Sequence, residues 1–117
     1  EEKIKEIVKD QSFDLILLGM GDDGHTASLF PNTNALKEES ALVVKNNVPQ
    51  KNTDRMTFTY PLLEKAQHIV FLATGKSKAE MVKEVLMDRE GKYPAGKVIC
   101  HRHKVLWAMD TAAASGL

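Results

Sequence analysis

The chain has 117 residues, 43% hydrophobic and 27% charged, a composition typical of one compact soluble domain. Its 16 basic residues balance 16 acidic ones, which argues against a nucleic-acid-binding protein, although a local cationic pocket is compatible with that balance. The single cysteine, Cys100, excludes a disulfide framework and a cysteine metal cluster, and no apolar run is long enough for a membrane span. With a charged N-terminus unlike a signal peptide, these features favour a cytoplasmic location.

The first part of the chain alternates between helical and strand-like patterns. Residues 1–11 have apolar side chains at helical spacing and predict an amphipathic helix without a cap. The apolar run at residues 15–18 predicts a strand buried on both faces. Residues 26–30 predict one or two helical turns, which Pro31 ends, and residues 41–44 predict a second strand.

The second part continues the alternation. Strands are expected at residues 55–59, 69–74 and 105–109, with a short helix that Pro61 opens between the first two. Ser77 and Glu80 have the spacing of a capping box and predict the start of a longer helix. A turn is expected at 91–96, and Asp110 is expected to cap an alanine-rich terminal helix. Strands alternating with helices, without an internal linker, predict one α/β unit with a mainly parallel sheet.

The most informative stretch is residues 14–31, DLILLGMGDDGHTASLFP. Three of its glycines have the G-x-G-x-x-G spacing of a dinucleotide-binding turn: Gly19, Gly21 and Gly24. The nucleotide interpretation is disfavoured, because Asp22 and Asp23 would repel a pyrophosphate and the expected helix is too short for a full crossover. Gly75-Lys76-Ser77 resembles the end of a P-loop, but Val70 stands where that motif needs glycine.

A second interpretation of the same loop is catalytic. The carboxyl end of a parallel strand is where open α/β sheets bind ligands, and glycines there allow close backbone approach. Asp-Gly-His would present His25 as a general base, with a carboxylate near enough to select its tautomer. Alternatively, Asp22 or Asp23 caps a short helix and His25 is a solvated loop residue. The spacing alone leaves both interpretations open.

The string LLGMGDDGHTASLFP closely resembles the signature of the 6-phosphogluconolactonase family. Three later segments, residues 54–61, 71–79 and 107–114, also resemble that family and occur in the same order. The likeness spans nearly the whole chain but corresponds to the C-terminal half of such an enzyme. Residues 1–117 are therefore expected to be the C-terminal half of a single α/β sugar-phosphate lactonase domain, whose N-terminal half would supply a further phosphate-binding loop.

The resemblance implies a Rossmann-like fold shared with glucosamine-6-phosphate deaminases and ribose-5-phosphate isomerases, of which this chain would be part. It implies hydrolysis of 6-phospho-D-glucono-1,5-lactone to 6-phosphogluconate, without a metal or organic cofactor. His25 matches the family's proposed catalytic histidine, and Asp23 would orient its imidazole. Arg55 and Lys78 match positions that contact the sugar phosphate, and backbone at Gly21 and Gly24 would approach the substrate.

Three alternatives remain. Arg55 and Lys78 can instead be ordinary basic residues on a solvated face. A glucosamine-6-phosphate deaminase also carries D-G-H, but this chain continues Thr26-Ala-Ser-Leu-Phe-Pro31, without the glutamate that assists ring opening there. A non-catalytic sugar-phosphate binding module is the rival from another class, and the chain alone is expected to be weak or inactive as an enzyme.

His101–Lys104 suggests a solvated basic turn, and Cys100 a small buried hydrophobe rather than a nucleophile.

Overall fold

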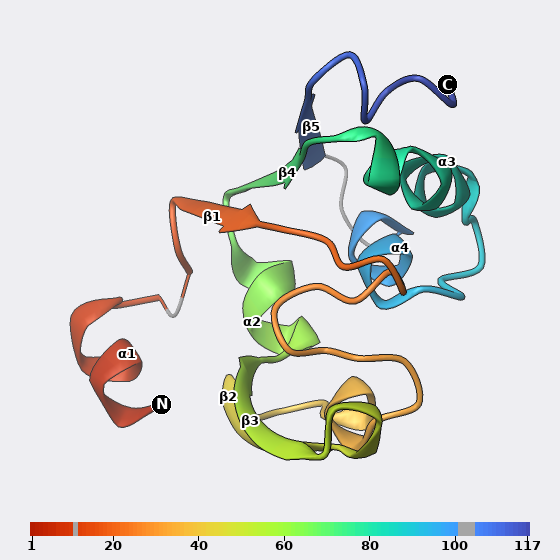
Figure 1. Ribbon diagram of the computed structural model, residues 1–117. Coiled ribbons are helices and arrows are strands. Elements are labelled where there is room, and N and C mark those ends of the chain that lie inside the picture. The colour runs from red at the N-terminus through yellow and green to blue at the C-terminus, as the bar shows by residue number, and fades with distance from the viewer. Residues whose placement is uncertain (11, 101–104) are drawn as a thin grey trace.

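The computed structural model describes residues 1–10, 12–100 and 105–117, so His101–Lys104 and the side chain of Cys100 lie outside the described residues. Three parallel strands form the main sheet in the order β1 (Leu15–Leu18), β4 (His68–Ala73) and β5 (Val105–Met109). Leu18 pairs with Phe71, so β1 and β4 end at the same edge (Figure 1). The expected α/β architecture with a parallel sheet is confirmed.

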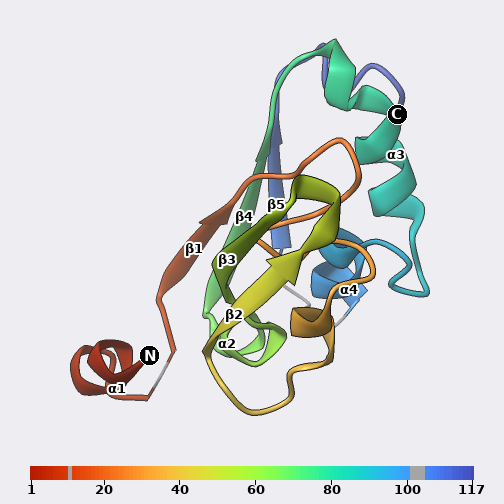
Figure 2. The same ribbon diagram turned by 60° about the horizontal axis from the view of Figure 1, so that its bottom comes forward.

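Helices cover one face of this sheet. They are α2 (Tyr60–Lys65), α3 (Ala79–Met87) and α4 (Pro94–Cys100), and Figure 2 shows α3 and α4 on one side of the strands. Buried side chains of the sheet pack against them in one core cluster: Ile16, Leu18, Ile69, Phe71 and Ala73 from the strands, and Leu62, Leu63, Val82, Val85, Ala95 and Val98 from the helices.

The other face of the sheet is open, which corrects the expectation that residues 15–18 are buried on both faces. Leu15 and Leu17 are 51% and 59% exposed, and Leu72 and Leu106 on the neighbouring strands are exposed as well. Strand side chains alternate between faces, so the helices cover only every second residue of β1. No described helix is long and apolar enough to cross a membrane.

The N-terminal helix α1 (Glu2–Ile7) is shorter than expected and stands apart from the three-stranded sheet (Figure 1). Its anchor is the Glu1 carboxylate, which pairs with Lys5 and accepts hydrogen bonds from the backbone N–H groups of Leu42 and Val43. These contacts, the Lys5 hydrogen bond first, lower the pKa of Glu1 to about 2.

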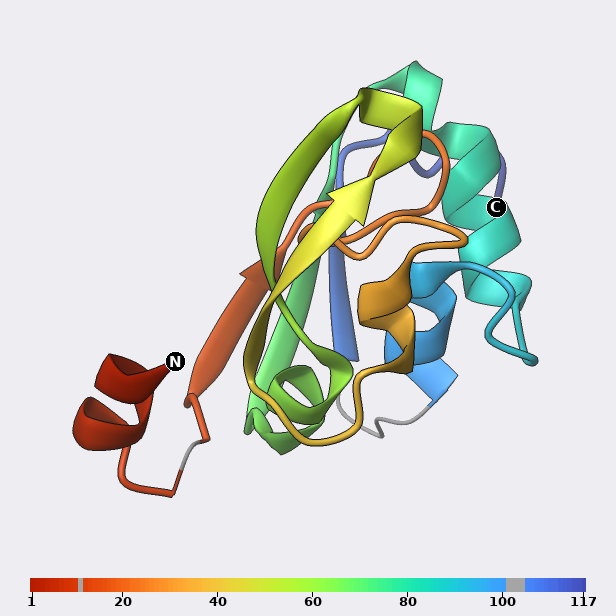
Figure 3. The same ribbon diagram turned by 90° about the horizontal axis from the view of Figure 1, so that it is seen from below.

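A separate antiparallel hairpin was not expected from the sequence. It comprises β2 (Val43–Val48) and β3 (Thr53–Phe58), with a 3₁₀ turn at Pro49–Lys51 between them (Figure 3). The expected strand at 41–44 was misplaced, because β2 begins at Val43 and continues through its polar half. Asn52 adopts the left-handed conformation (φ 47°) that lets the chain reverse direction.

Residues 26–30 form a tight loop and not the helical turns expected. Side-chain hydrogen bonds replace the helical pattern: the Thr26 hydroxyl donates to the Gly19 carbonyl, and the Ser28 N–H donates to the Thr57 hydroxyl. Ala27 has a positive φ of 51°, which a right-handed helix does not allow. The second of these bonds comes from a residue 29 positions along the chain, so a distant contact shapes this loop.

Helix boundaries near the sheet edge also differ from expectation. Ser77 lies in a 3₁₀ turn, η3 (Lys76–Lys78), so Lys78 and not Ser77 occupies the N-cap of α3. In α3, Val82 and Val85 are buried, whereas Leu86 is 38% exposed. Helix α4 occupies part of the turn expected at 91–96, beginning at Pro94. After β5 the chain forms turns without a helix, although Asp110 accepts the Ala113 N–H as a cap would.

Asn46 links the hairpin to the loop after β1. Its side chain is 1% exposed, and its Oδ1 accepts the Ala35 N–H at 3.2 Å. Its Nδ2 donates to the Ser28 carbonyl at 2.9 Å and to the Thr33 hydroxyl at 3.0 Å. This buried amide therefore makes three hydrogen bonds, and it fixes where the chain runs after residue 28.

We predict that Asn46→Ala lowers the free energy of unfolding by about 2–4 kcal/mol, because it leaves buried backbone and hydroxyl groups without partners. The neighbouring Asn47 is exposed and bonds only to Asp54 among the described residues, so Asn47→Ala is the matched control. Urea unfolding of both variants measures the difference. Equal losses for the two variants would contradict the role assigned to Asn46.

Candidate active site

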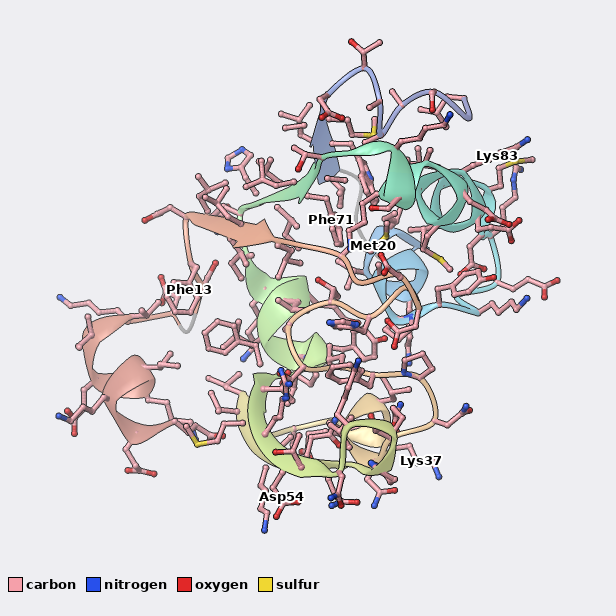
Figure 4. The ribbon with its side chains drawn as sticks, in the orientation of Figure 1. Phe13, Met20, Lys37, Asp54, Phe71 and Lys83 are labelled. Atoms are coloured by element: carbon pink, nitrogen blue, oxygen red, sulfur yellow. The ribbon has the colours of Figure 1, made fainter. Side chains whose placement is uncertain are left out.

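A cleft of about 530 Å³ lies at the carboxyl edge of the sheet. Gly19, Gly21 and His25 from the loop after β1 line it, together with Lys78 from the turn after β4. Met20 also lines the cleft and is buried in the same core cluster as Phe71 (Figure 4). Ligands of open α/β sheets bind at this edge.

Asp23 holds His25 in two ways with one oxygen atom. The Oδ1 atom of Asp23 lies 2.6 Å from the imidazole Nδ1 and also accepts the backbone N–H of His25 at 3.0 Å. Partial burial disfavours the charged carboxylate, but these hydrogen bonds outweigh it, so the pKa of Asp23 is lowered. The imidazole is consequently anchored through Nδ1, which leaves Nε2 as the ring nitrogen available for chemistry.

The loop closes tightly around this pair, and two glycines allow it. The Gly21 N–H donates to the His25 carbonyl, and the Gly24 N–H donates to the Gly21 carbonyl. A Cβ atom at Gly21 would overlap the imidazole of His25. Gly24 has a φ of 79°, and a Cβ there would lie 2.8 Å from the ring of Tyr93. Both positions therefore require glycine for the loop itself; whether their backbone also meets a substrate stays a prediction.

Phe30 is the site residue that the sequence analysis missed. Its ring is 1% exposed and stacks on the imidazole of His25, with centroids 4.0 Å apart and planes inclined by 19°. The guanidinium of Arg55 lies 5.6 Å from the centroid of the same ring. The Leu-Phe-Pro ending of the motif could have indicated this contact, because a phenylalanine five residues after a loop histidine can fold back and pack on the imidazole.

Lys78 contributes a cation to the lining of the cleft. Its Nζ donates to Oδ1 of Asp22 at 2.9 Å, and its side chain is 26% exposed. Arg55 is exposed on β3, does not line the cleft, and is connected to the site through Phe30. The structure therefore brings Gly21, Asp23, His25 and Lys78 together, whereas Arg55 lies beside them and Gly24 is buried beneath.

This arrangement suits proton transfer next to an anion. A neutral imidazole that donates its Nδ1 proton to Asp23 carries its lone pair on Nε2, the requirement for a general base. The Lys78 ammonium can attract an anionic group in the same cleft. Within the described part of the chain, no cluster of three or more His, Cys, Asp or Glu side chains could hold a metal ion.

Comparison with known proteins places the site in a family. Residues 1–107 match the family described as glucosamine-6-phosphate isomerases/6-phosphogluconolactonase. The 6-phosphogluconolactonase of Chlamydia pneumoniae is 46% identical over 113 residues, which are 94% of this chain and 44% of that protein.

Solved structures show the same relationship. The 6-phosphogluconolactonase of Trypanosoma brucei superposes with a TM-score of 0.77 at 31% identity, over 91% of this chain and 43% of that one. A monomeric glucosamine-6-phosphate deaminase gives a TM-score of 0.75 at 26% identity, over 99% of this chain and 52% of its own. The chain thus spans less than half the length of the curated relatives that it matches.

We predict that Asp23 titrates below the ordinary aspartate pKa of about 3.9. A carboxyl whose pKa is lowered by folding stabilises the fold above its ordinary pKa, and this stabilisation disappears as the pH falls through the lowered value. Carboxyl ¹³C NMR from about pH 6 to about pH 2 measures the titration. His25→Ala should raise the pKa of Asp23 and leave that of Asp54, which Asn47 and Lys45 lower, unchanged. An unshifted Asp23 would contradict the proposed anchoring.

Proposed function

The chain belongs to the family of glucosamine-6-phosphate isomerases and 6-phosphogluconolactonases, and we propose that it carries the catalytic base of a 6-phosphogluconolactonase. The substrate would be 6-phospho-D-glucono-1,5-lactone and the product 6-phosphogluconate. The observation that carries this proposal is the imidazole of His25, anchored through Nδ1 by Asp23 in a cleft that also contains Lys78. The names of the relatives support the choice of substrate.

In the proposed reaction, Nε2 of His25 takes a proton from a water molecule as that water attacks the lactone carbonyl. The carboxylate of Asp23 stabilises the imidazolium that forms and keeps its orientation. When the tetrahedral intermediate collapses, the ring C–O bond breaks and the leaving hydroxyl oxygen takes the proton from the imidazolium. The histidine returns to its starting state, and one water molecule has been consumed.

Lys78 would hold the substrate's phosphate at the other end of the cleft. A cation at the N-cap of α3 is disfavoured by the helix dipole, so an anion bound there would be stabilised by both charges. Arg55 would be a second phosphate ligand, and its planar donors suit that role. In the structure the Arg55 side chain is exposed and its guanidinium lies by the ring of Phe30. To contact a phosphate in the cleft, this side chain would rotate over that ring.

The deaminase alternative rests on the structural likeness to the monomeric glucosamine-6-phosphate deaminase. The segment after His25 argues against a deaminase, because residues 27–31 contain no carboxylate. The Thr26 hydroxyl cannot easily replace one, since it is buried and donates to the Gly19 carbonyl. Ring opening of an amino sugar needs such an acid-base group near the substrate. The lactonase remains the better-supported proposal.

We predict that His25→Ala lowers kcat for lactone hydrolysis by about 10²- to 10⁴-fold, the usual contribution of a general base, while phosphate binding is retained. Proton release, followed with a pH indicator on the protein encoded by the natural reading frame, measures the rate. His68→Ala is the matched control, because His68 is exposed on β4 and does not line the cleft. Unchanged turnover in the His25 variant would refute the assignment, and ammonia release from glucosamine 6-phosphate would favour the deaminase.

We also propose that these residues are the C-terminal half of one lactonase domain, and that the open face of the sheet packs against the rest of it. Parallel sheets are normally covered on both faces, whereas Leu15, Leu17, Leu72 and Leu106 are exposed here. The length of the relatives, more than twice that of the match, supports this arrangement.

We predict that Leu17→Ala changes the free energy of unfolding of the 117-residue chain by less than about 1 kcal/mol, because half of this side chain is already exposed. The adjacent Leu18 is 5% exposed, so Leu18→Ala is the matched comparison and should cost about 2–5 kcal/mol. In the protein encoded by the natural reading frame, the Leu17 loss should approach the Leu18 loss. A Leu17 variant that is neutral in both proteins would contradict packing on this face.

A further inference from the structure

Asp22 has no role in the mechanism above, yet it has a specific partner. Its Oδ1 accepts a hydrogen bond from Nζ of Lys78 at 2.9 Å, across 56 positions of sequence. The contact follows from the topology: Asp22 lies in the loop after β1, Lys78 lies in the turn after β4, and these neighbouring parallel strands end together. An ion pair thus spans the edge of the cleft that His25 also lines.

The two partners of this ion pair are held very differently. The Lys78 side chain is 26% exposed and starts from the N-cap of α3, so its ammonium stays near the cleft. The Asp22 side chain is 79% exposed and lies in a turn, so it can rotate into water at small cost. Exposed ion pairs of this kind are weak and readily exchanged.

We propose that Asp22 is an internal competitor of the phosphate group for Lys78, and so sets how tightly the cleft holds phosphate. The inference rests on the proposed role of Lys78 as a phosphate ligand. A bound phosphate displaces the Asp22 carboxylate from Nζ, and when the phosphate leaves, the carboxylate returns to the ammonium. The affinity of the cleft for phosphate is therefore lower than Lys78 alone would give.

Two effects make the competition measurable. Phosphate binding must break the Lys78–Asp22 pair, and the displaced carboxylate then lies close to a phosphate that carries nearly two negative charges. Both effects vanish in Asp22→Asn, which keeps the size of the side chain and removes its charge. We expect inorganic phosphate to bind Asp22→Asn about three- to tenfold more tightly than the unchanged chain at low ionic strength.

The experiment titrates the chain with inorganic phosphate and follows the backbone amide signals of Gly75 and Lys78 by NMR. Asp54→Asn is the matched control, because it removes the same charge from an exposed ion pair, with Lys45 at 2.9 Å, on the hairpin away from the cleft (Figure 4). Its phosphate affinity should stay within about twofold of the unchanged chain. Lys78→Met should weaken binding, and adding Asp22→Asn to it should then give a smaller gain, because only the repulsion between the carboxylate and the phosphate is left to remove.

Equal affinities in Asp22→Asn and Asp54→Asn would overturn the inference, as would a gain of the same size without Lys78. Absence of phosphate binding at these amides in every variant would overturn it too. These outcomes differ from failure of the lactonase proposal, which is measured by turnover: phosphate competition can hold in a chain that hydrolyses no lactone. In an active protein, Asp22→Asn should lower KM and leave kcat at the chemical step unchanged, a split that general damage to the loop would not produce.

Discussion

The parallel, in-register pairing of β1 with β4 is the constraint from which the site follows. Because Leu18 lies opposite Phe71, the loop from Gly19 to His25 and the turn that carries Lys78 leave the sheet at one edge. Residues more than 50 positions apart thereby line one cleft. The register depends in turn on burial of the inward side chains of both strands, since a shift by one residue would exchange the buried face of β1 with its exposed leucines.

Two adjacent carboxylates in this loop contact two different side chains of the cleft lining, His25 and Lys78. Asp23 turns inward and holds the His25 ring and backbone N–H with a single oxygen, while Asp22 turns outward to the Lys78 ammonium. Neighbouring residues in a turn project in different directions, so one dipeptide can serve a base and a cation. The Asp23 side chain is 41% exposed and the Asp22 side chain 79%, so the contact with His25 is the less exposed of the two, which matches the different roles proposed for them.

Local sequence patterns predicted much of the secondary structure, whereas contacts between distant residues determine the loop shapes and several side-chain partners. The strands of the parallel sheet and the α/β class could be predicted from apolar runs, whereas the contact of Asp23 with His25 was expected from the resemblance, because the spacing alone left it open. The loop at 26–30 could not, because its shape depends on a hydroxyl from β3 and on the buried amide of Asn46. Nor could the stacking of Phe30 on His25 or the partner of Asp22, since neither is visible without knowing which loops meet. The exposure of Leu17 could not be predicted either, because the apolar run of β1 does not say which faces of the sheet are covered.

His25 and the two cations, Lys78 and Arg55, also differ in how far contacts within this chain position them. Every contact that orients His25, from Asp23, Phe30 and the space left by Gly21, comes from within twelve residues of the strand's end. The base is therefore preorganised by its own loop. The cations are not gathered in the same way, because Lys78 is paired with Asp22 and Arg55 lies outside the cleft. In the proposed reaction, a surface that packs on the open sheet would thus help to position the phosphate and the lactone, a contribution that can be worth several powers of ten in rate, whereas the orientation of His25 is set within this chain.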